Sequence, residues 1–230
     1  MTDDSPPLVL LPGMDGSGRL FAPFVAALPT SRRAIILRYP QTLASYDELT
    51  DYAVRFLPEG PCVLLGESFS GPVAARLAQR FPERVRALVL AASFVAAPLP
   101  RFFASMAPSF YGSAASAWLV KYLMASKRTP PEILATIMEI LAEAPQEMWR
   151  GRLRAALTED ARPQLAATRC PLLVLQAGSD RLLRAPTTMQ ILRTRPCVAM
   201  RLTGAPHLLM QSAPAECASA IAGFLHRSLV

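Results

Sequence analysis

The sequence predicts an α/β protein built on a mostly parallel, six-stranded sheet with helices on both faces. Of its 230 residues, 52% are hydrophobic and 18% are charged, which is typical of a globular protein with much buried sheet. Short apolar runs recur along the chain, as in strands buried on both faces of a parallel sheet. Segments with helical periodicity separate these runs. The length suits a single domain, with or without an insertion.

Six apolar runs are rich in Val, Leu and Ile and do not alternate with polar residues, so we expect each to form a buried strand. They are Leu8–Leu11, Ala34–Leu37, Cys62–Leu65, Val85–Leu90, Leu172–Leu175 and Val198–Leu202.

Helical patterns fill most of the intervals between these runs. They predict helices at Gly18–Ala27, Tyr46–Phe56, Gly71–Phe81, Pro186–Arg193 and Pro214–Arg227. Ser17 is placed to cap the first helix, and Pro214 stands where proline opens a helix at little cost.

The alternation of strand and helix stops between the fourth and fifth strands, where residues from Ala97 to about Pro163 carry helical signals only. We therefore predict a core made of residues 1–97 and 164–230, and a helical cap, or lid, inserted at 98–163. Thr129 and Glu132 occupy the two positions of a capping box. Large apolar side chains follow the spacing of one helix face, which indicates either packing within the insertion or the wall of a pocket. They are Phe102, Phe103, Met106, Phe110, Trp118, Leu119, Tyr122, Leu123 and Met124.

The net charge of +7 comes from scattered arginines with no interleaved aromatic residues, which argues against nucleic acid as a partner. Basic residues of the insertion have two interpretations, a docking face for an acidic carrier protein or a solvated helix face. They are Lys127, Arg128, Arg150, Arg152 and Arg154.

No segment predicts a membrane span. The uncharged stretch from Phe102 to Val120 is interrupted by Pro108 and Gly112. The first residues lack the basic and apolar regions of a secretory signal, so we expect a cytoplasmic protein. The four cysteines are widely separated, which favours reduced, buried thiols over a disulfide framework or a zinc site.

Ser68 lies in the segment Gly66–Ser70, between a predicted strand and a predicted helix. This is the context that a G-x-S-x-G nucleophile elbow needs. So sharp a turn strains the serine backbone and leaves room only for small side chains two positions away. Ser70 stands where glycine is commoner, although serine is also small. A serine that caps the following helix is the alternative interpretation.

A nucleophilic serine needs a base to take its proton and an acid to orient that base. Of the two histidines, His226 lies in the last turn of the final predicted helix, whereas His207 follows the last strand. Asp180 follows the fifth strand, and a turn or helix-cap aspartate is its alternative interpretation. His207 and Asp180 both belong to the carboxyl edge of the sheet, where chemistry collects in α/β proteins. We predict that Ser68, Asp180 and His207 are the catalytic residues.

A glycine-rich loop, Leu10–Gly18, follows the first strand and leads into a helix, so its backbone N–H groups can face a developing negative charge. We predict an oxyanion hole made by the backbone N–H groups of Met14 and Phe69. A phosphate cradle is the alternative. However, the glycine spacing G-x-x-G-x-G differs from the dinucleotide fingerprint, and no P-loop ending follows.

Together these segments resemble the α/β-hydrolase superfamily, in which the triad also runs in the order Ser, Asp, His. The matching segments are Leu11–Gly18, Gly66–Gly71, Gly178 with Asp180, and Gly204 with His207. The glycine-rich loop and the elbow also look like those of bacterial α/β hydrolases and, less closely, of the acyltransferase domain of plant phytyl ester synthases.

The resemblance covers about Pro7 to Ala97 and Leu165 to Val230, and it does not extend to the insertion. Leu11-Pro12-Gly13 replaces the His-Gly pair of many members. The chain also starts at what would be the family's third strand, which leaves six strands.

The resemblance implies a carboxylesterase-like serine hydrolase that forms an acyl-enzyme from a small-molecule ester with an apolar acyl or alcohol group. No metal or organic cofactor is implied. An acyltransferase or thioesterase with the same triad is one alternative, and a non-catalytic ligand-binding protein on this scaffold is another. Glu67 is predicted either to tuck beneath the elbow and bond to a group behind the catalytic residues, or to be solvated.

Overall fold

The computed structural model describes residues 5–99, 114–183, 185–202 and 204–229. It contains a six-stranded sheet in the order β2-β1-β3-β4-β5-β6, and every neighbouring pair is parallel. The strands are β1 (Leu8–Leu11), β2 (Ala34–Ile36), β3 (Cys62–Glu67), β4 (Val85–Ala91), β5 (Leu172–Ala177) and β6 (Val198–Leu202). The predicted strands are all present, and β3, β4 and β5 run one or two residues further than the apolar runs. The predicted class and strand number are confirmed.

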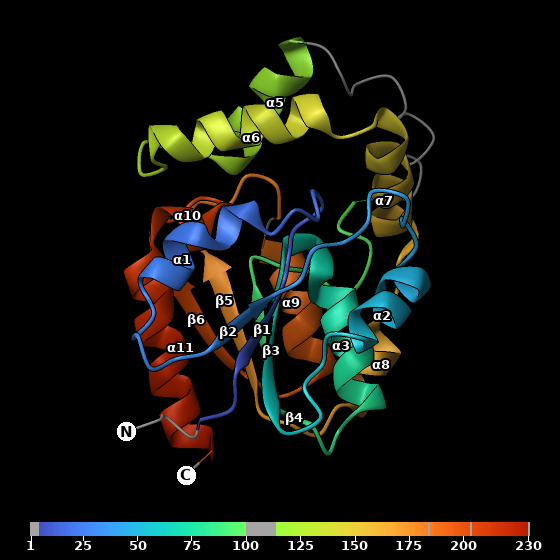
Figure 1. Cartoon of the computed structure of the whole chain (residues 1–230), viewed down its shortest axis with the longest axis vertical. Coiled ribbons are helices and arrows are strands. Elements are labelled where there is room, and N and C mark those ends of the chain that lie inside the picture. Colours follow the sequence, from blue (N-terminus) through green and yellow to red (C-terminus); the bar gives the residue numbers. More distant parts are fainter. Residues whose placement is uncertain (1–4, 100–113, 184, 203, 230) are drawn as a thin grey trace.

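Helices cover both faces of the sheet (Figure 1). One face carries α2 (Tyr46–Val54), α3 (Gly71–Arg80), α8 (Arg162–Ala167) and α9 (Ala185–Thr194). The other carries α1 (Ala22–Ala26), α10 (Leu209–Ser212) and α11 (Pro214–Leu229), with the short 3-10 helix η1 (Arg19–Phe21) before α1.

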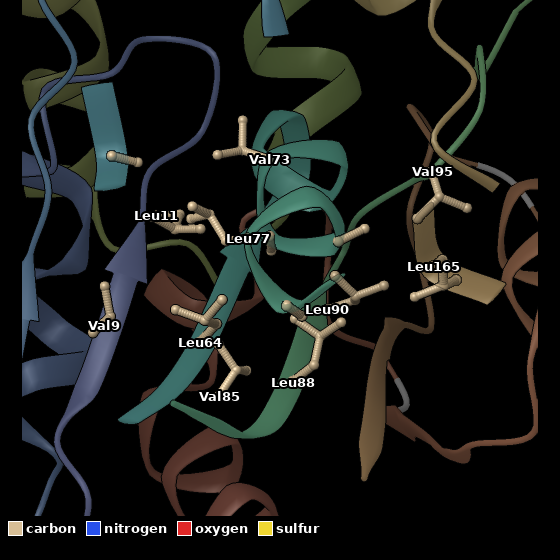
Figure 2. Packing of buried hydrophobic residues seen from close by; sticks show 14 of the residues in the cluster. Val9, Leu11, Leu64, Val73, Leu77, Val85, Leu88, Leu90, Val95 and Leu165 are labelled. Atoms are coloured by element: carbon tan, nitrogen blue, oxygen red, sulfur yellow. The ribbon is translucent and has the colours of Figure 1, made fainter. Parts of the chain in front are cut away.

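The side chains of each strand alternate between two hydrophobic clusters, one on each face of the sheet. Val9 and Leu64 point toward α2 and α3, whereas Leu8 and Val63 point toward α1 and α11. Figure 2 shows part of the first cluster, including Leu77 of α3. Because both faces are buried, the strands need apolar residues at consecutive positions, which explains the uninterrupted runs in the sequence.

Between β4 and α8, the described residues contain three helices, α5 (Ala114–Met124), α6 (Pro131–Glu143) and α7 (Gln146–Thr158). Figure 1 shows α5 and α6 above the carboxyl ends of the strands, with α7 descending beside them. A third hydrophobic cluster joins these helices to the core below, through contacts that include Ile137, Trp149 and Leu208. Of the predicted apolar face, Phe102, Phe103, Met106 and Phe110 lie outside the described residues.

The predicted capping box at Thr129 and Glu132 is wrong. The residue before α6 is Pro130, whose side chain has no hydrogen-bonding group, and the Thr129 hydroxyl instead accepts from the Ser126 N–H and bonds to the Ser212 hydroxyl. The capping box of the described chain is at α2, where Ser45 and Glu48 bond to each other's backbone N–H.

The first helix begins as η1, with Gly18 at the N-cap position, and the predicted Ser17 hydroxyl accepts from the Arg19 N–H of its first residue at 3.2 Å. Gly18 has φ +70°, and a Cβ there would lie 2.6 Å from Ile36 Cγ2. Glycine is therefore required by both conformation and space, and these requirements are invisible in a propensity pattern.

All four cysteines are free thiols, and three of them are buried while Cys197 is half-buried. Burial raises the pKa of the Cys62 thiol to about 11, so it stays protonated at neutral pH. Within the described residues, no helix is both long enough and apolar enough to cross a bilayer.

Strand β3 turns into α3 through the 3-10 helix η2 (Ser68–Ser70), and the turn is closely packed on both sides. A Cβ at Gly66 would lie 2.8 Å from the Ser70 carbonyl oxygen. A Cβ at Gly71 would lie 2.2 Å from the carbonyl oxygen of Phe94 and equally close to Ser93 Oγ. The backbone of Gly71 is right-handed helical, so space alone requires glycine there.

We expect Gly71→Ala to lower the free energy of unfolding by about 3 kcal/mol, because the added methyl group must displace the backbone after β4. Gly60→Ala is the matched control, since a Cβ at Gly60 meets nothing within 4 Å. Urea unfolding of both variants measures the difference. If Gly71→Ala were as stable as Gly60→Ala, the turn would be able to accommodate a methyl group without loss of stability, and the expectation would be wrong.

Candidate active site

Three side chains from distant parts of the sequence form one chain of hydrogen bonds at the carboxyl edge of the sheet. Ser68 Oγ lies 2.8 Å from His207 Nε2, and His207 Nδ1 lies 2.8 Å from Asp180 Oδ2. The side chains of His207 and Asp180 are only 2% and 4% exposed. A hydroxyl, an imidazole and a carboxylate are thus aligned in the order that base-assisted nucleophilic attack requires.

The turn at the end of β3 holds Ser68 in a left-handed backbone conformation, with φ 47°. A non-glycine residue in this region is strained, and such strain persists only where the surroundings impose it. The Ser93 hydroxyl donates to the Ser68 carbonyl, and Tyr46 Oη donates to the Phe69 carbonyl at 3.1 Å. Side chains from the loop after β4 and from α2 therefore fix two consecutive peptide groups of the turn.

Asp180 is held by the backbone of its own loop. Its Oδ1 accepts from the N–H groups of Leu182 and Leu183, each at 2.8 Å, which leaves Oδ2 for the imidazole. The loop that carries His207 is bonded to the same region, because Ser179 N–H donates to the Ala205 carbonyl. The carboxylate and the imidazole are therefore positioned by two loops that hold each other.

His226, the other histidine, is exposed on α11. It takes no part in the hydrogen bonds at the carboxyl edge of the sheet.

Glu67 is buried directly before the serine and accepts a hydrogen bond from Gln211 Nε2 at 2.8 Å. Gln211, on α10, also donates to the Leu20 carbonyl, but its Oε1 has no partner among the described residues. Burial raises the pKa of Glu67 to about 7, with nearby Asp15 adding to the rise, while Gln211 and His207 oppose it. Glu67 therefore titrates near neutral pH.

The loop after β1 lies beside the serine. Met14, Asp15 and Ser68 line the same cavity, and no described group accepts a hydrogen bond from the Met14 N–H. The Ser70 hydroxyl donates to the Pro12 carbonyl and lies 2.9 Å from Tyr39 Oη. Ser70, at the position where glycine is commoner, thus uses its hydroxyl to fasten the loop to the elbow.

A cavity of about 420 Å³ opens above Ser68, and its walls are almost entirely apolar. Asp15, Glu67, Ser68 and His207 are its polar and ionisable side chains. The apolar lining consists of Leu20, Leu99, Leu119, Val120, Leu123, Met124, Ile137, Ile140, Leu141, Trp149, Leu153, Leu157, Leu182 and Leu208, with Met14 near the base. A space of this size suits a small molecule with a hydrocarbon part.

Helix α5 lines the cavity with some of its side chains and exposes others. Of the described residues in the predicted apolar face, Leu119, Leu123 and Met124 line the cavity. Trp118 and Tyr122 instead face outward, 65% and 49% exposed, and their rings stack 5.4 Å apart. The five described side chains of this set therefore do not share a single face.

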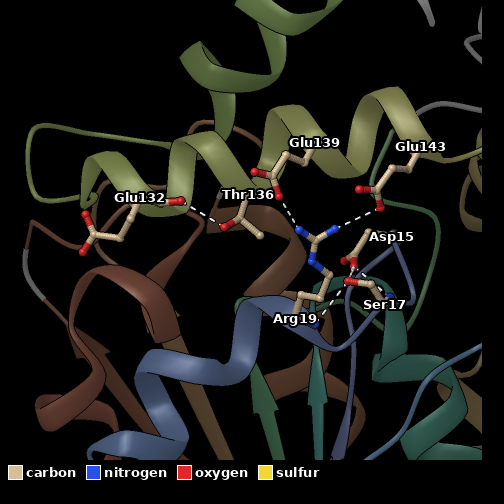
Figure 3. A network of polar contacts seen from close by, with 7 residues as sticks. All are labelled: Asp15, Ser17, Arg19, Glu132, Thr136, Glu139 and Glu143. Atoms are coloured by element: carbon tan, nitrogen blue, oxygen red, sulfur yellow. Dashed lines mark hydrogen bonds and ion pairs between the residues drawn. The ribbon is translucent and has the colours of Figure 1, made fainter.

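Polar contacts fasten the inserted helices to the site. Arg19, which follows the glycine-rich loop, forms ion pairs with Glu139 and Glu143 of α6 (Figure 3). The Leu208 N–H, next to His207, donates to the Met124 carbonyl at 3.0 Å. The ion pairs are solvent-exposed and contribute little, whereas the backbone bond joins the end of α5 directly to the histidine loop.

Arg152 differs from the sequence prediction. The sequence predicts a docking face or a solvated helix face for the basic residues of the insertion, but the Arg152 side chain is 0% exposed and donates to three backbone carbonyls. Neither a carrier-protein contact nor a solvated face fits this residue. Arg154 on the same helix is exposed. The acidic carrier protein stays a prediction for the other basic residues.

Arg152, Gln211 and Tyr39 are the residues near the site that sequence reasoning missed. Gln211 and Tyr39 gave no signal, because an isolated polar residue near an apolar run is common. For Arg152 one signal existed, since it lies three positions after Trp149 and three before Ala155, on the helix face that the apolar spacing assigns to the interior.

The parallel sheet and the strand–turn–helix serine define the class of protein. The alpha/beta hydrolase family model matches residues 8–220, and the chain belongs to this family. No curated protein sequence matches the chain. Among the described residues, no group of three or more His, Cys, Asp and Glu side chains is placed to hold a metal ion.

Several solved structures share the fold. A thermophilic esterase from Thermogutta terrifontis, in a malate-bound structure, has 21% identity and a TM-score of 0.82, over 98% of this chain and 91% of that chain. The enol-lactonase from Burkholderia xenovorans LB400 has 18% identity and a TM-score of 0.83, over 97% and 92%. A bromoperoxidase from Bacillus anthracis has 20% identity and a TM-score of 0.77, over 96% and 92%. At these identities the likeness concerns the fold.

We expect Glu67→Gln to remove a pH dependence of stability. In the wild type, the pKa of Glu67 is higher in the folded state than in the unfolded state, so the folded state binds the extra proton between about pH 4.5 and pH 7. Stability therefore falls as pH rises through this interval, by on the order of 2–3 kcal/mol from this group. The amide of the variant stays neutral and can donate to Gln211 Oε1.

Urea unfolding at pH 5 and pH 8 tests this expectation. The free energy of unfolding of Glu67→Gln relative to wild type should rise between the two pH values. Glu48→Gln is the matched control, because hydrogen bonds to Ser45 lower the pKa of Glu48 and keep it ionised throughout this range. If the difference in free energy of unfolding between Glu67→Gln and wild type were the same at pH 5 and pH 8, the raised pKa of Glu67 in the folded state would be contradicted.

Proposed function

We propose that the protein is a serine hydrolase that cleaves carboxylic esters with an apolar acyl or alcohol group. One observation carries the proposal: the Ser68–His207–Asp180 hydrogen-bond chain lies at the base of an apolar cavity. The catalytic residues supply ester cleavage through an acyl-enzyme, and the apolar walls select hydrocarbon. Family membership supports hydrolysis as the class of reaction.

In the proposed reaction, His207 Nε2 takes the Ser68 proton while Oγ attacks the ester carbonyl carbon. The carbonyl oxygen becomes an oxyanion, which the backbone N–H groups of Met14 and Phe69 stabilise. As the ester C–O bond breaks, the imidazolium returns its proton to the departing alcohol. Water then attacks the acyl-enzyme with His207 again acting as base, and the free acid and the Ser68 hydroxyl are restored.

In the proposed cycle, Asp180 orients His207 and does not itself take the serine proton. Because its Oδ1 is occupied by two backbone N–H groups, Oδ2 faces His207 Nδ1 and selects the tautomer whose Nε2 can accept the serine proton. The same carboxylate stabilises the imidazolium when it forms.

We further propose that residues 98–163 act as a cap over the reaction. The support is that α5, α6 and α7 supply most of the apolar cavity wall. An apolar cover excludes water from the hydrocarbon part of the substrate and strengthens electrostatic interactions at the carbonyl.

Replacing Ser68 with Ala should lower ester hydrolysis by about four to six orders of magnitude, because the three residues act as a unit. A fluorophosphonate probe should add one phosphonyl group to the wild type, at Ser68, as located by mass spectrometry. An adduct of unchanged mass and yield on Ser68→Ala, or none on the wild type, would leave a non-catalytic binding protein as the better interpretation.

We expect water to be the main acyl acceptor. The polar side chains of the described cavity wall are Asp15, Glu67, Ser68 and His207, so no further polar group there orients the hydroxyl of an acceptor alcohol. With an activated short-chain ester, free acid should remain the main product when an alcohol is added. A product mixture dominated by the new ester would instead identify an acyltransferase with the same residues.

A further inference from the structure

In the loop that follows β1, side chains hold the carbonyls of the two residues on either side of Gly13. On one side, the Ser70 hydroxyl donates to the Pro12 carbonyl. On the other, Arg152 Nη1 donates to the Met14 carbonyl at 2.8 Å. The peptide group between Gly13 and Met14, whose N–H belongs to the proposed oxyanion hole, is therefore fixed from both ends.

The Arg152 guanidinium also spans the chain segment after β2. Its Nη2 donates to the Pro40 carbonyl at 2.8 Å and its Nε to the Leu43 carbonyl at 3.1 Å. All three acceptors are backbone carbonyls with fixed directions, which match the planar fork of a guanidinium. A lysine has a single ammonium group and cannot satisfy three acceptors spread in this way.

The surroundings of Arg152 are closed. Gly16, at φ +72°, lies so close that a Cβ there would be 2.4 Å from Nη1. The Tyr39 ring centroid lies 5.8 Å from the guanidinium carbon, within the range of a cation–π contact. Burial lowers the pKa of Arg152, an effect that nearby Asp15 and Tyr39 oppose, and a guanidinium remains charged in proteins.

Arg152 reaches the loop from α7, and the neighbouring part of the same helix surface faces the cavity. Trp149, Leu153 and Leu157 of this helix line the cavity, and Arg152 points to the carbonyls beneath. One helix thus contacts both the space for the hydrocarbon group and the loop beside the nucleophile.

We propose that Arg152 is a positioning residue that sets the direction of the Met14 N–H, so that the oxyanion hole is complete only when α7 is seated. This inference rests on the proposed function of the site. Arg152 touches no reacting atom and acts through the peptide group that it holds. Without it, three buried carbonyls lose their donor. The Gly13–Met14 peptide group then keeps the hydrogen bond from the Gly16 N–H to the Gly13 carbonyl at 3.0 Å, but loses its support on the Met14 side.

The test compares Arg152→Met and Arg152→Lys with the control Arg154→Met, which removes an exposed arginine from the same helix. Hydrolysis of p-nitrophenyl butyrate gives kcat and KM. Binding of butylboronic acid, which forms a tetrahedral adduct with a nucleophilic serine, reports on the oxyanion hole. We expect kcat to fall about 10–100-fold in Arg152→Met while KM changes less than about threefold.

The affinity for the boronic acid should weaken by a similar factor, because only the tetrahedral adduct uses the oxyanion hole. Arg152→Lys should lie between Arg152→Met and wild type, and Arg154→Met should match wild type. Thermal unfolding of each variant shows whether it is folded. If Arg152→Met is unfolded, the kcat and the boronic-acid affinity of Arg152→Lys test the inference instead. A folded Arg152 variant with wild-type kcat and wild-type affinity for the boronic acid would overturn the inference.

Failure of the proposed function and failure of the positioning role of Arg152 give different experimental results. A wild type without ester hydrolysis or a fluorophosphonate adduct would refute the proposed function. An active wild type whose folded Arg152 variants are equally active would leave that function in place and refute only the positioning role.

Discussion

All six strands run in the same direction, so each delivers its carboxyl end to the same edge of the sheet. This constraint brings together Ser68, Asp180 and His207, which are more than a hundred positions apart at the extremes. Each side chain stands in the loop or turn directly after its strand, at β3, β5 and β6. The apolar strands themselves contribute no chemistry, but their pairing decides which loops are neighbours.

The region around Ser68 illustrates how tightly such an edge must be built. Gly66 and Gly71 have no space for a side chain, and Ser68 has a strained backbone. Ser70 stands where the common motif has glycine, and its hydroxyl donates to the Pro12 carbonyl. The strained backbone of Ser68, the close packing and the hydrogen bonds are therefore parts of one arrangement.

The strands could be predicted because burial on both faces leaves an unbroken apolar run. The three residues of the hydrogen-bond chain could also be predicted, because their types are few and each follows a strand. The Thr129–Glu132 capping box was wrong because Pro130 already opens the helix, and local spacing does not reveal which residue is the cap. Arg152 was misjudged for a related reason: its three partners are backbone carbonyls of other segments, and carbonyls leave no mark in a sequence.

The position of the inserted helices also has a consequence for how the chain folds. Leu88 of β4 pairs with Leu172 of β5, so the sheet is joined across roughly eighty residues of intervening chain. Each doubling of the length of a closed loop adds only about 0.6 kcal/mol to the entropic cost of closing it. A crossover four times longer than one of about 20 residues is thus disfavoured by only about 1.2 kcal/mol. Evolution can therefore lengthen or replace this segment while the strand order stays the same. Such changes alter the wall of the cavity above Ser68.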